Sequence, residues 1–310
     1  MLYKYFLILF FSFINILSIG VKASYDYYGR IAVDSQSLSR TNAGTKLDIA
    51  SNESKLGLKG NFALGNKSET KIIYQIEYGI DLVDGKVRGD DGTLKKRNTY
   101  LGIQNKLGTL FVGTHDSAFK KAQLKVDLFN DLAPDIKNVL HGENRLEDFI
   151  GYITPKYQGV FSATFNSIKN SSSSRKKYKS YSLNYSGNRF LAAFAIDEGM
   201  KGYDSSRLSF IYPFAGSKLG FIYQETKELS SGMKKNGGVL SFITNINSKG
   251  RIKFQYAVSS MKIDLGKHST IGYDHQLIKG LRIFTFYSVL NSRVTSKEKN
   301  IFSIGLEYKF

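Results

Sequence analysis

The sequence predicts an all-β fold: a 16-stranded antiparallel transmembrane β-barrel with a long third loop folded into the lumen. Three observations support this prediction. Short segments throughout the chain alternate apolar and polar residues, as strands do when one face contacts an apolar medium. Short turns and long loops connect these segments in alternation. The 310 residues include 20 Tyr, 22 Phe and 29 Gly but only 3 Pro, which favours strands over helices.

Residues 1–23 have the pattern of a secretory signal peptide. Lys4 supplies a positive charge, an apolar stretch covers 5–17, and Val21-Lys22-Ala23 is a cleavage site of the A-x-A kind. The apolar stretch is shorter than the ~20 residues that a membrane-spanning helix needs. We therefore expect residues 1–23 to be removed on export, and residues 24–310 to form one barrel domain.

The alternating segments are short and bounded by turn residues. The clearest is 251–260, which places Ile252, Phe254 and Tyr256 on one face and Arg251 and Lys253 on the other. Sixteen segments are predicted to be strands: 25–34, 53–64, 69–80, 97–104, 109–115, 149–157, 160–168, 179–185, 189–197, 207–212, 218–226, 237–245, 251–260, 268–276, 280–291 and 301–310. An even strand number is typical of an outer-membrane barrel, and closure leaves no sheet edge in hydrocarbon.

The predicted connections differ in length. Short turns are expected at 65–67, 105–108, 158–159, 186–188 and 277–279, and long loops at 35–52, 81–96, 116–148 and 169–178. A soluble β-sandwich also alternates apolar and polar residues, but short turns at one end and long loops at the other are typical of an outer-membrane barrel. After the signal peptide, no stretch approaches ~18 consecutive apolar residues, so no transmembrane helix is expected.

The connection 116–148 is the longest departure from alternation, at 33 residues. Its acidic residues are Asp116, Asp127, Asp131, Asp135, Glu143, Glu147 and Asp148. Long connections in compact folds are either functional or mobile. We expect this loop to fold inward and narrow a channel, and an ordinary surface loop is the alternative.

Basic residues are expected to line the opposite side of that channel. The candidates on the polar faces of the strands are Lys55, Lys59, Lys71, Arg207, Lys218, Arg251, Lys253 and Lys309. The net charge is +18, or +16 without Lys4 and Lys22 of the signal peptide. This charge is spread along an exported chain, so a nucleic-acid partner is not expected. Charged rings set channel selectivity, and the basic excess predicts a weak preference for anions.

The sequence offers little for catalysis or metal binding. It has four His, no Cys, no pair of His at metal-ligand spacing and no G-x-S-x-G or phosphate-binding motif. We therefore expect neither an enzyme nor a metal or other cofactor.

Several segments resemble one known family. They are 54–60 (SKLGLKG), 97–103 (RNTYLGI), 107–113 (LGTLFVG), 152–155 (YITP), 273–279 (YDHQLIK) and 305–310 (GLEYKF). Together the segments resemble the Gram-negative general porins, most of all their neisserial-type trimeric branch. The resemblance implies an outer-membrane homotrimer in contact with lipid and lipopolysaccharide. It also implies passive diffusion of small hydrophilic solutes and ions.

The end of the chain and two inner positions bear on this resemblance. Terminal Phe310, after alternating aromatics, is similar to the signal that the barrel-assembly machinery reads. The family often has Arg at the end of the fifth strand, where this chain has Thr114-His115. Gly151 and Ile153 replace polar or charged residues of the sixth strand. The charge pattern of the narrowest section therefore stays open.

Two other functions remain possible from the sequence. A structural or adhesive outer-membrane barrel would have no open pore, and its external loops would be the functional part. A substrate-specific channel would show a line of aromatic residues on the lumen face, whereas the alternation places most aromatics on the lipid face. Single-channel conductance distinguishes an open pore from a closed barrel.

Overall fold

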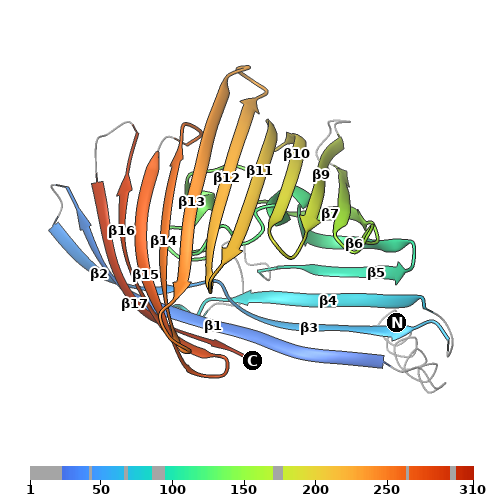
Figure 1. The fold of residues 1–310 in the computed structure, drawn as a ribbon, viewed down its shortest axis with the longest axis horizontal. Coiled ribbons are helices and arrows are strands. Elements are labelled where there is room, and N and C mark those ends of the chain that lie inside the picture. Colours follow the sequence, from blue (N-terminus) through green and yellow to red (C-terminus); the bar gives the residue numbers. More distant parts are fainter. Residues whose placement is uncertain are drawn as a thin grey trace, which may run out of the picture.

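The computed structural model describes residues 23–41, 44–65, 69–85, 95–169, 177–262, 265–293 and 298–310. The expected signal peptide lies outside these residues except for Ala23, the first residue of β1. Figure 1 shows one continuous sheet that curves around a central space. Its strands are β1 (Ala23–Arg40), β2 (Gly44–Ser51), β3 (Ser54–Ala63), β4 (Lys71–Ile80), β5 (Thr99–Asn105), β6 (Gly108–Asp116), β7 (Arg145–Ile153), β8 (Phe161–Lys169), β9 (Lys177–Ser186), β10 (Leu191–Met200), β11 (Tyr203–Phe214), β12 (Ser217–Glu228), β13 (Lys234–Asn245), β14 (Gly250–Ser259), β15 (Lys267–Ile278), β16 (Leu281–Asn291) and β17 (Glu298–Lys309).

Seventeen strand segments fill sixteen positions in this sheet. The first half of β1 pairs with β3, from Ala23 to Arg30, and the second half pairs with β2, from Val33 to Arg40. β2 and β3 therefore occupy one position, interrupted at residues 52–53. The pairing of β1 with β17 closes the sheet, and consecutive strands are antiparallel. The prediction of a closed 16-stranded antiparallel barrel is confirmed.

The predicted long loop 35–52 is wrong. Residues 35–40 continue β1, and residues 44–51 form β2 beside them. Gln36 and Leu38 are buried on the inner face. The alternation was missed because the outward positions between them carry Ser35, Ser37 and Ser39, which are polar rather than apolar. Long connections do occur at one end of the barrel, at 81–98 and 117–144, although 86–94 lie outside the described residues. The predicted loop 169–178 lies largely outside them as well.

The two faces of the wall differ in exposure. On β14, Phe254 and Tyr256 are 39% and 36% exposed, whereas Lys253 and Gln255 are 3% and 0% exposed. Most other strands repeat this pattern, with large apolar side chains outward and polar ones inward. This arrangement suits a lipid-facing exterior and a polar interior. Among the described residues, no helix is both long and apolar enough to cross a membrane.

The third long loop is shorter than predicted. It covers 117–144, because Arg145 to Asp148 already belong to β7. The loop contains α2 (Ala118–Lys121) and the short 3₁₀ helix η1 (Ile136–Asn138). The side-chain oxygens of Ser117 and Asp135 cap these helices by accepting hydrogen bonds from backbone N–H groups in their first turns.

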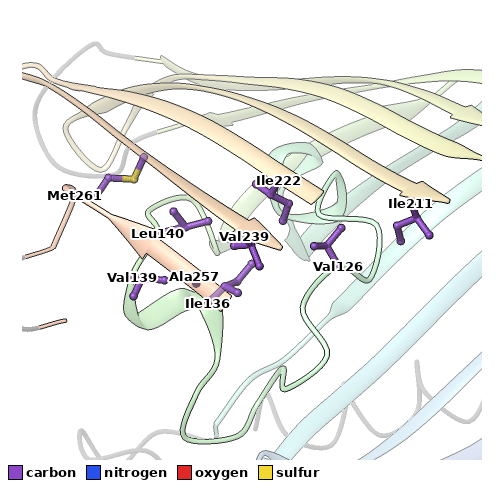
Figure 2. Packing of buried hydrophobic residues seen from close by; sticks show 9 residues of the cluster. All are labelled: Val126, Ile136, Val139, Leu140, Ile211, Ile222, Val239, Ala257 and Met261. Carbon is purple, nitrogen blue, oxygen red and sulfur yellow. The ribbon is translucent and has the colours of Figure 1, made fainter. Parts of the chain in front are cut away.

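Apolar contacts hold this loop against the inner wall. Figure 2 shows one cluster in which Val126, Ile136 and Leu140 of the loop pack with strand residues such as Ile222 and Val239. Another cluster, around Phe129 and Leu132 of the loop, uses residues of β1, β16 and β17. The loop therefore covers a large part of the inner face, and burial of these side chains stabilises it there.

Inward-facing phenylalanines are more numerous than the alternation predicted. Six are buried on the inner side or in the loop: Phe111, Phe119, Phe129, Phe149, Phe284 and Phe286. They pack with one another and with the loop instead of forming an exposed line. Their burial is possible because small residues lie beside them. At Gly151, for example, a Cβ atom would come within 2.3 Å of the Phe111 ring.

Candidate channel lumen

A cavity of about 770 Å³ lies between the loop and the inner wall. The basic residues that line it are Arg30, Lys55, Arg97, Lys120, Lys121, Lys125, Arg145, Arg251, Lys253, Arg282 and Lys309. The acidic residues that line it are Asp116, Asp127, Asp131, Asp274 and Glu307. Eleven bases against five acids leave an excess of six positive charges around this space.

Glu307 of β17 organises one part of the basic wall. Its carboxylate accepts from Arg30 Nε at 2.7 Å and from Arg282 Nε at 2.8 Å, and lies 3.0 Å from Lys309 Nζ. Arg282 stands directly across from Glu307 in the register of β16 and β17. Arg30 also reaches the loop, where Nη1 lies 2.7 Å from the Asp131 carboxylate. The carboxylate of Glu307 therefore fixes three cations, Arg30, Arg282 and Lys309, at the edge of the cavity.

Asp274 of β15 likewise binds several basic side chains, next to Glu307. Its two oxygens lie 2.9 Å from Lys253 Nζ and 2.9 Å from Arg251 Nη2, and Arg282 Nη1 also contacts it. Arg282 thus joins Asp274 to Glu307, because its guanidinium contacts both. Asp274 is 2% exposed and cannot be reached freely by solvent cations. The cations around the two carboxylates outnumber them, so this side of the lumen stays positive.

A third group lies on β1, β3 and β4 and on Arg97 of the connection before β5. Glu77 accepts from Lys55 Nζ at 2.7 Å, from Arg97 Nε at 2.8 Å and from the Tyr28 hydroxyl at 2.9 Å. Arg97 also donates to Glu53. These hydrogen bonds hold the long basic side chains in fixed positions, which lowers the entropy lost when an anion approaches them.

The loop presents bases to the cavity more than acids. Lys120 lies 3.0 Å from Asp116, and Arg145 lies 3.1 Å from the same carboxylate. Lys121 and Lys125 also line the cavity, and neither forms an ion pair within the described parts of the chain. The loop 117–144 contains four acids and four lysines, so the excess of acids expected over 116–148 disappears once the strand residues are excluded.

Two of the four acids of the loop, Asp127 and Asp135, stabilise the loop itself. Asp127 is buried and accepts from the backbone N–H groups of Phe129 and Ile136, at 3.0 and 3.1 Å. Asp135 accepts from the backbone N–H groups of Asp131 and Lys137, at 2.8 and 2.7 Å. Burial, together with nearby Asp135, raises the pKa of Asp127 well above its usual range. These carboxylates therefore do not form the exposed acidic side of the channel that the sequence led us to expect.

Arg207 differs most from its expected position. It faces inward from β11 but is only 1% exposed, because the loop covers it. Its guanidinium donates to Glu143 at 2.7 Å, to Gln224 at 2.7 Å and to the His141 carbonyl at 3.2 Å. It also lies 4.4 Å from the centre of the Phe119 ring. Burial raises the pKa of Glu143, although Arg207 opposes this shift. Arg207 is therefore an anchor for the loop and does not line the open lumen.

Lys253 lines the cavity and also contacts the inner loop. Its Nζ lines the cavity and contacts Asp274, yet it also donates to the Leu128 carbonyl at 3.3 Å and lies 4.5 Å from the centre of the Phe129 ring. The loop is bound from the same strand by Gln255, which accepts from the Leu128 N–H at 2.7 Å. Lys253 is thus part of the wall and part of the contact that holds the loop.

The remaining predicted basic residues lie away from the main cavity. Lys59 is exposed, and its Nζ lies 5.5 Å from the centre of the Tyr28 ring. Lys71 and Lys218 are exposed at the ends of β4 and β12 nearest the short turns. All three lie on the polar face of their strands. Alternation predicts which face of the wall a residue is on, but not its position along the barrel axis.

Two predicted acids lie in a strand and not in the loop. Glu147 of β7 is exposed, and its carboxylate lies 4.0 Å from Lys96 Nζ. Asp148 is also exposed in β7. An ion pair this exposed contributes little to stability.

Phe310 lies at the seam where the barrel closes. Its backbone exchanges hydrogen bonds with Gly29 of β1, at 3.0 and 3.2 Å. The ring stacks on Tyr308 with 5.6 Å between centroids and fills the space where a Cβ atom of Gly29 would stand. The end of β17 therefore lies beside Gly29 of β1, whereas the first residue of β1, Ala23, pairs with Phe62 of β3.

Sequence reasoning missed several residues that organise the lumen: Arg30, Glu77, Arg97, Asp274, Arg282 and Glu307. Their signal was present, because Glu307 alternates with Leu306 and Tyr308 and so falls on the polar face. The predicted wall includes only the bases of that face. The inner wall therefore alternates acids with bases instead of being almost wholly basic.

A closed barrel of sixteen strand positions, with apolar residues outward and a charged inner cavity, defines an outer-membrane channel protein. The chain belongs to the Gram-negative porin family, whose sequence model matches residues 17–295. The resemblance seen in the sequence is thereby confirmed at the level of this family, as are the outer-membrane location and a channel function without enzymatic activity. Within the described residues, no group of His, Asp or Glu could hold a metal ion.

Solved structures show the same fold at low sequence identity. An anion-selective porin from Comamonas acidovorans is 19% identical with a TM-score of 0.76, over 93% of this chain and 100% of that one. Salmonella typhi OmpF in complex with daunomycin is 16% identical with a TM-score of 0.72, over 92% and 97%. A trimer form of OmpT from Vibrio cholerae is 10% identical with a TM-score of 0.69, over 93% and 99%. No individually curated protein matches the chain by sequence.

Proposed function

We propose that this porin lets small hydrophilic anions diffuse through its lumen in preference to cations. One observation carries the proposal: eleven basic residues and five acidic residues line the cavity between loop and wall. A pore whose lining carries an excess of one sign concentrates ions of the opposite sign. The similar fold of an anion-selective porin is compatible with this proposal.

The loop 117–144 is proposed to set the width of the channel. It packs on β11 to β14 and on β1, β16 and β17, and Asp131 reaches Arg30 of β1. Its own acids are largely occupied, by Arg207 for Glu143 and by backbone N–H groups for Asp127 and Asp135. The exposed charges of the loop at the cavity are then those of Lys121 and Lys125.

The assembly is proposed to be a homotrimer in contact with lipid and lipopolysaccharide. Each chain is proposed to lose its signal peptide, residues 1–23, before assembly. The trimer form of OmpT, which shares the fold, supports the trimer. Phe310 is proposed as the residue read by the barrel-assembly machinery, since it follows the last strand of the sheet directly. The segments quoted from the sequence favour the neisserial-type branch of the family.

The aromatic lining of the cavity does not favour a substrate-specific channel. Among the described residues that border it, Tyr28 and Phe310 are the aromatic ones, and Phe310 lies at the rim. A line of stacked rings that could guide an apolar solute is therefore missing from the cavity.

An adhesive barrel without a pore would give no conductance in a planar bilayer.

The proposal is tested by the reversal potential of the purified porin in a planar bilayer with a KCl gradient. We expect a sign that corresponds to chloride preference. The preference should weaken as salt rises, because the Debye length falls from ~10 Å at 0.1 M to ~3 Å at 1 M. Potassium preference would overturn anion selectivity and leave the family assignment intact.

A further inference from the structure

A second cavity lies at the opposite, long-loop end of the barrel. Its volume is about 750 Å³, and it is enclosed by the ends of β1, β16 and β17, the connection after β14, and Ala133 and Asn138 of the inner loop. It shares no lining residue with the main cavity. The inner loop therefore separates two spaces, and the second one faces the side from which external solutes arrive.

Two cations of this second cavity face each other across the sheet. Arg40 of β1 and Lys299 of β17 stand directly opposite each other in the sheet register. Neither is in an ion pair with any residue that the structure describes. Like charges directly opposite in antiparallel strands destabilise the sheet. An anion placed between these two side chains would remove that repulsion.

Lys262 adds a third positive charge from the opposite side. Its Nζ donates to the Lys137 carbonyl of the inner loop, which holds the ammonium group at the cavity. Burial lowers the pKa of Lys262, while Asp135 and Glu143 oppose this shift. Among the lining residues that the structure describes, Glu298 is the one acid, and Arg40, Lys262 and Lys299 are the bases.

The floor of the cavity is apolar. Leu290 and Ile301 are 6% and 1% exposed, and Leu265 packs against the same cluster. An apolar surface combined with a few placed charges is typical of small-molecule sites, whose volumes are about 300–1,000 Å³. A plain inorganic anion would use the cations and leave this floor in contact with water.

We propose that the second cavity is a binding site for a small amphiphilic anion, such as an aromatic carboxylate. The carboxylate would lie between Arg40 and Lys299, and the ring would cover Leu290 and Ile301. This site is distinct from the charge selectivity of the main cavity, since the two spaces share no residue. The barrel would then hold an external solute beside the inner loop before it diffuses onward.

The test is calorimetric titration of the full mature porin in lipid nanodiscs with benzoate. Acetate has the charge without the ring, and benzyl alcohol has the ring without the charge. We expect saturable binding of one benzoate per chain, about tenfold tighter than either control compound. Equal affinity for benzoate and acetate, or for benzoate and benzyl alcohol, would overturn the proposal.

Two variants locate the site. The double variant Arg40→Gln/Lys299→Gln should weaken benzoate binding about tenfold or more. Lys234→Gln, an exposed lysine of β13 that does not line the cavity, should leave binding unchanged. Circular dichroism and the open-channel conductance of each variant verify that the barrel has folded. Unchanged binding in a folded Arg40→Gln/Lys299→Gln barrel would rule out this cavity.

The titration and the reversal potential have separate outcomes. Loss of chloride preference with intact benzoate binding would overturn the proposed selectivity alone. Chloride preference without benzoate binding would overturn only the proposal that the second cavity is a binding site.

Discussion

Arg207 of the barrel wall and Glu143 of the inner loop form a buried ion pair, with 2.7 Å between Nη1 and Oε1. The side chain of Arg207 is 0% exposed and that of Glu143 is 7% exposed. Gln224 and the carbonyls of Phe119 and His141 accept the remaining hydrogen bonds of the guanidinium. The position of the loop in the lumen is therefore tied to one cation that solvent does not reach.

Removal of this cation should loosen the loop. Arg207→Met leaves Glu143 buried without its cation, with Gln123 as its remaining side-chain donor at 3.2 Å, and breaking a buried ion pair costs about 3–5 kcal/mol. We expect a lower free energy of unfolding in urea and noisier single-channel currents, because the loop is released at one anchor. The double variant Arg207→Met/Glu143→Met removes both charges and should recover much of the lost stability. Equal stability of the single and double variants would contradict the anchor.

Asp127 should make the stability of the loop depend on pH. Burial and nearby Asp135 raise its pKa well above the usual range, so the folded state binds a proton that the unfolded state releases. Stability then falls as pH rises, from the ordinary carboxyl pKa of ~4 up to the raised value. Urea unfolding of the wild type should show greater stability at pH 5 than at pH 8.

Asp127→Asn provides the control for this pH dependence. The variant has no charge to lose at residue 127, so its stability should change less between pH 5 and pH 8. It also loses one carboxylate acceptor for the N–H of Phe129 or Ile136, which lowers its stability at both pH values. An identical pH slope in the wild type and the variant would show that other groups cause the dependence.

Two substitutions should move ion selectivity in opposite directions. Lys121→Gln/Lys125→Gln removes two unpaired positive charges from the cavity and should reduce chloride preference. Asp274→Asn removes the carboxylate that contacts Arg251, Lys253 and Arg282, and should raise that preference. Reversal potentials in one KCl gradient compare the two variants. Lys234→Gln, which lies outside the cavity, is the matched control.

A charge on the outer face should be costly. Phe254 is 39% exposed on the lipid side of β14, so Phe254→Arg should lower the free energy of unfolding by ~2–4 kcal/mol if the residue lies near the bilayer midplane. Phe254→Leu keeps an apolar side chain and should have a much smaller effect. Unfolding of the refolded barrel in lipid vesicles measures both. Equal losses in the two variants would contradict the lipid-facing assignment.

Alternation predicted most of the barrel because lipid imposes an apolar outer face on each strand. It identified β14, where Phe254 and Tyr256 face outward and Lys253 faces inward. It fails at Ser35, Ser37 and Ser39, whose outward positions carry hydroxyls, and so predicts a loop where the end of β1 and all of β2 lie.

The lumen was harder to predict than the wall. The sequence places Lys55, Arg251 and Arg207 on the inner face alike. Only the path of the loop decides that Lys55 and Arg251 border the cavity, whereas Arg207 is buried beneath the loop. Ion pairs such as Arg282 with Glu307 depend on strand register, which an alternating pattern does not determine.

The seam between β1 and β17 has a consequence for the time course of folding. Arg30 and Glu307, which meet across it, are 277 residues apart in the chain. Contacts between such distant residues form slowly, because closing a long chain segment costs entropy before any contact compensates for it. Until Phe310 reaches Gly29, the edges of β1 and β17 remain unpaired and can join another chain. The chain is therefore vulnerable to aggregation until β17 pairs with β1.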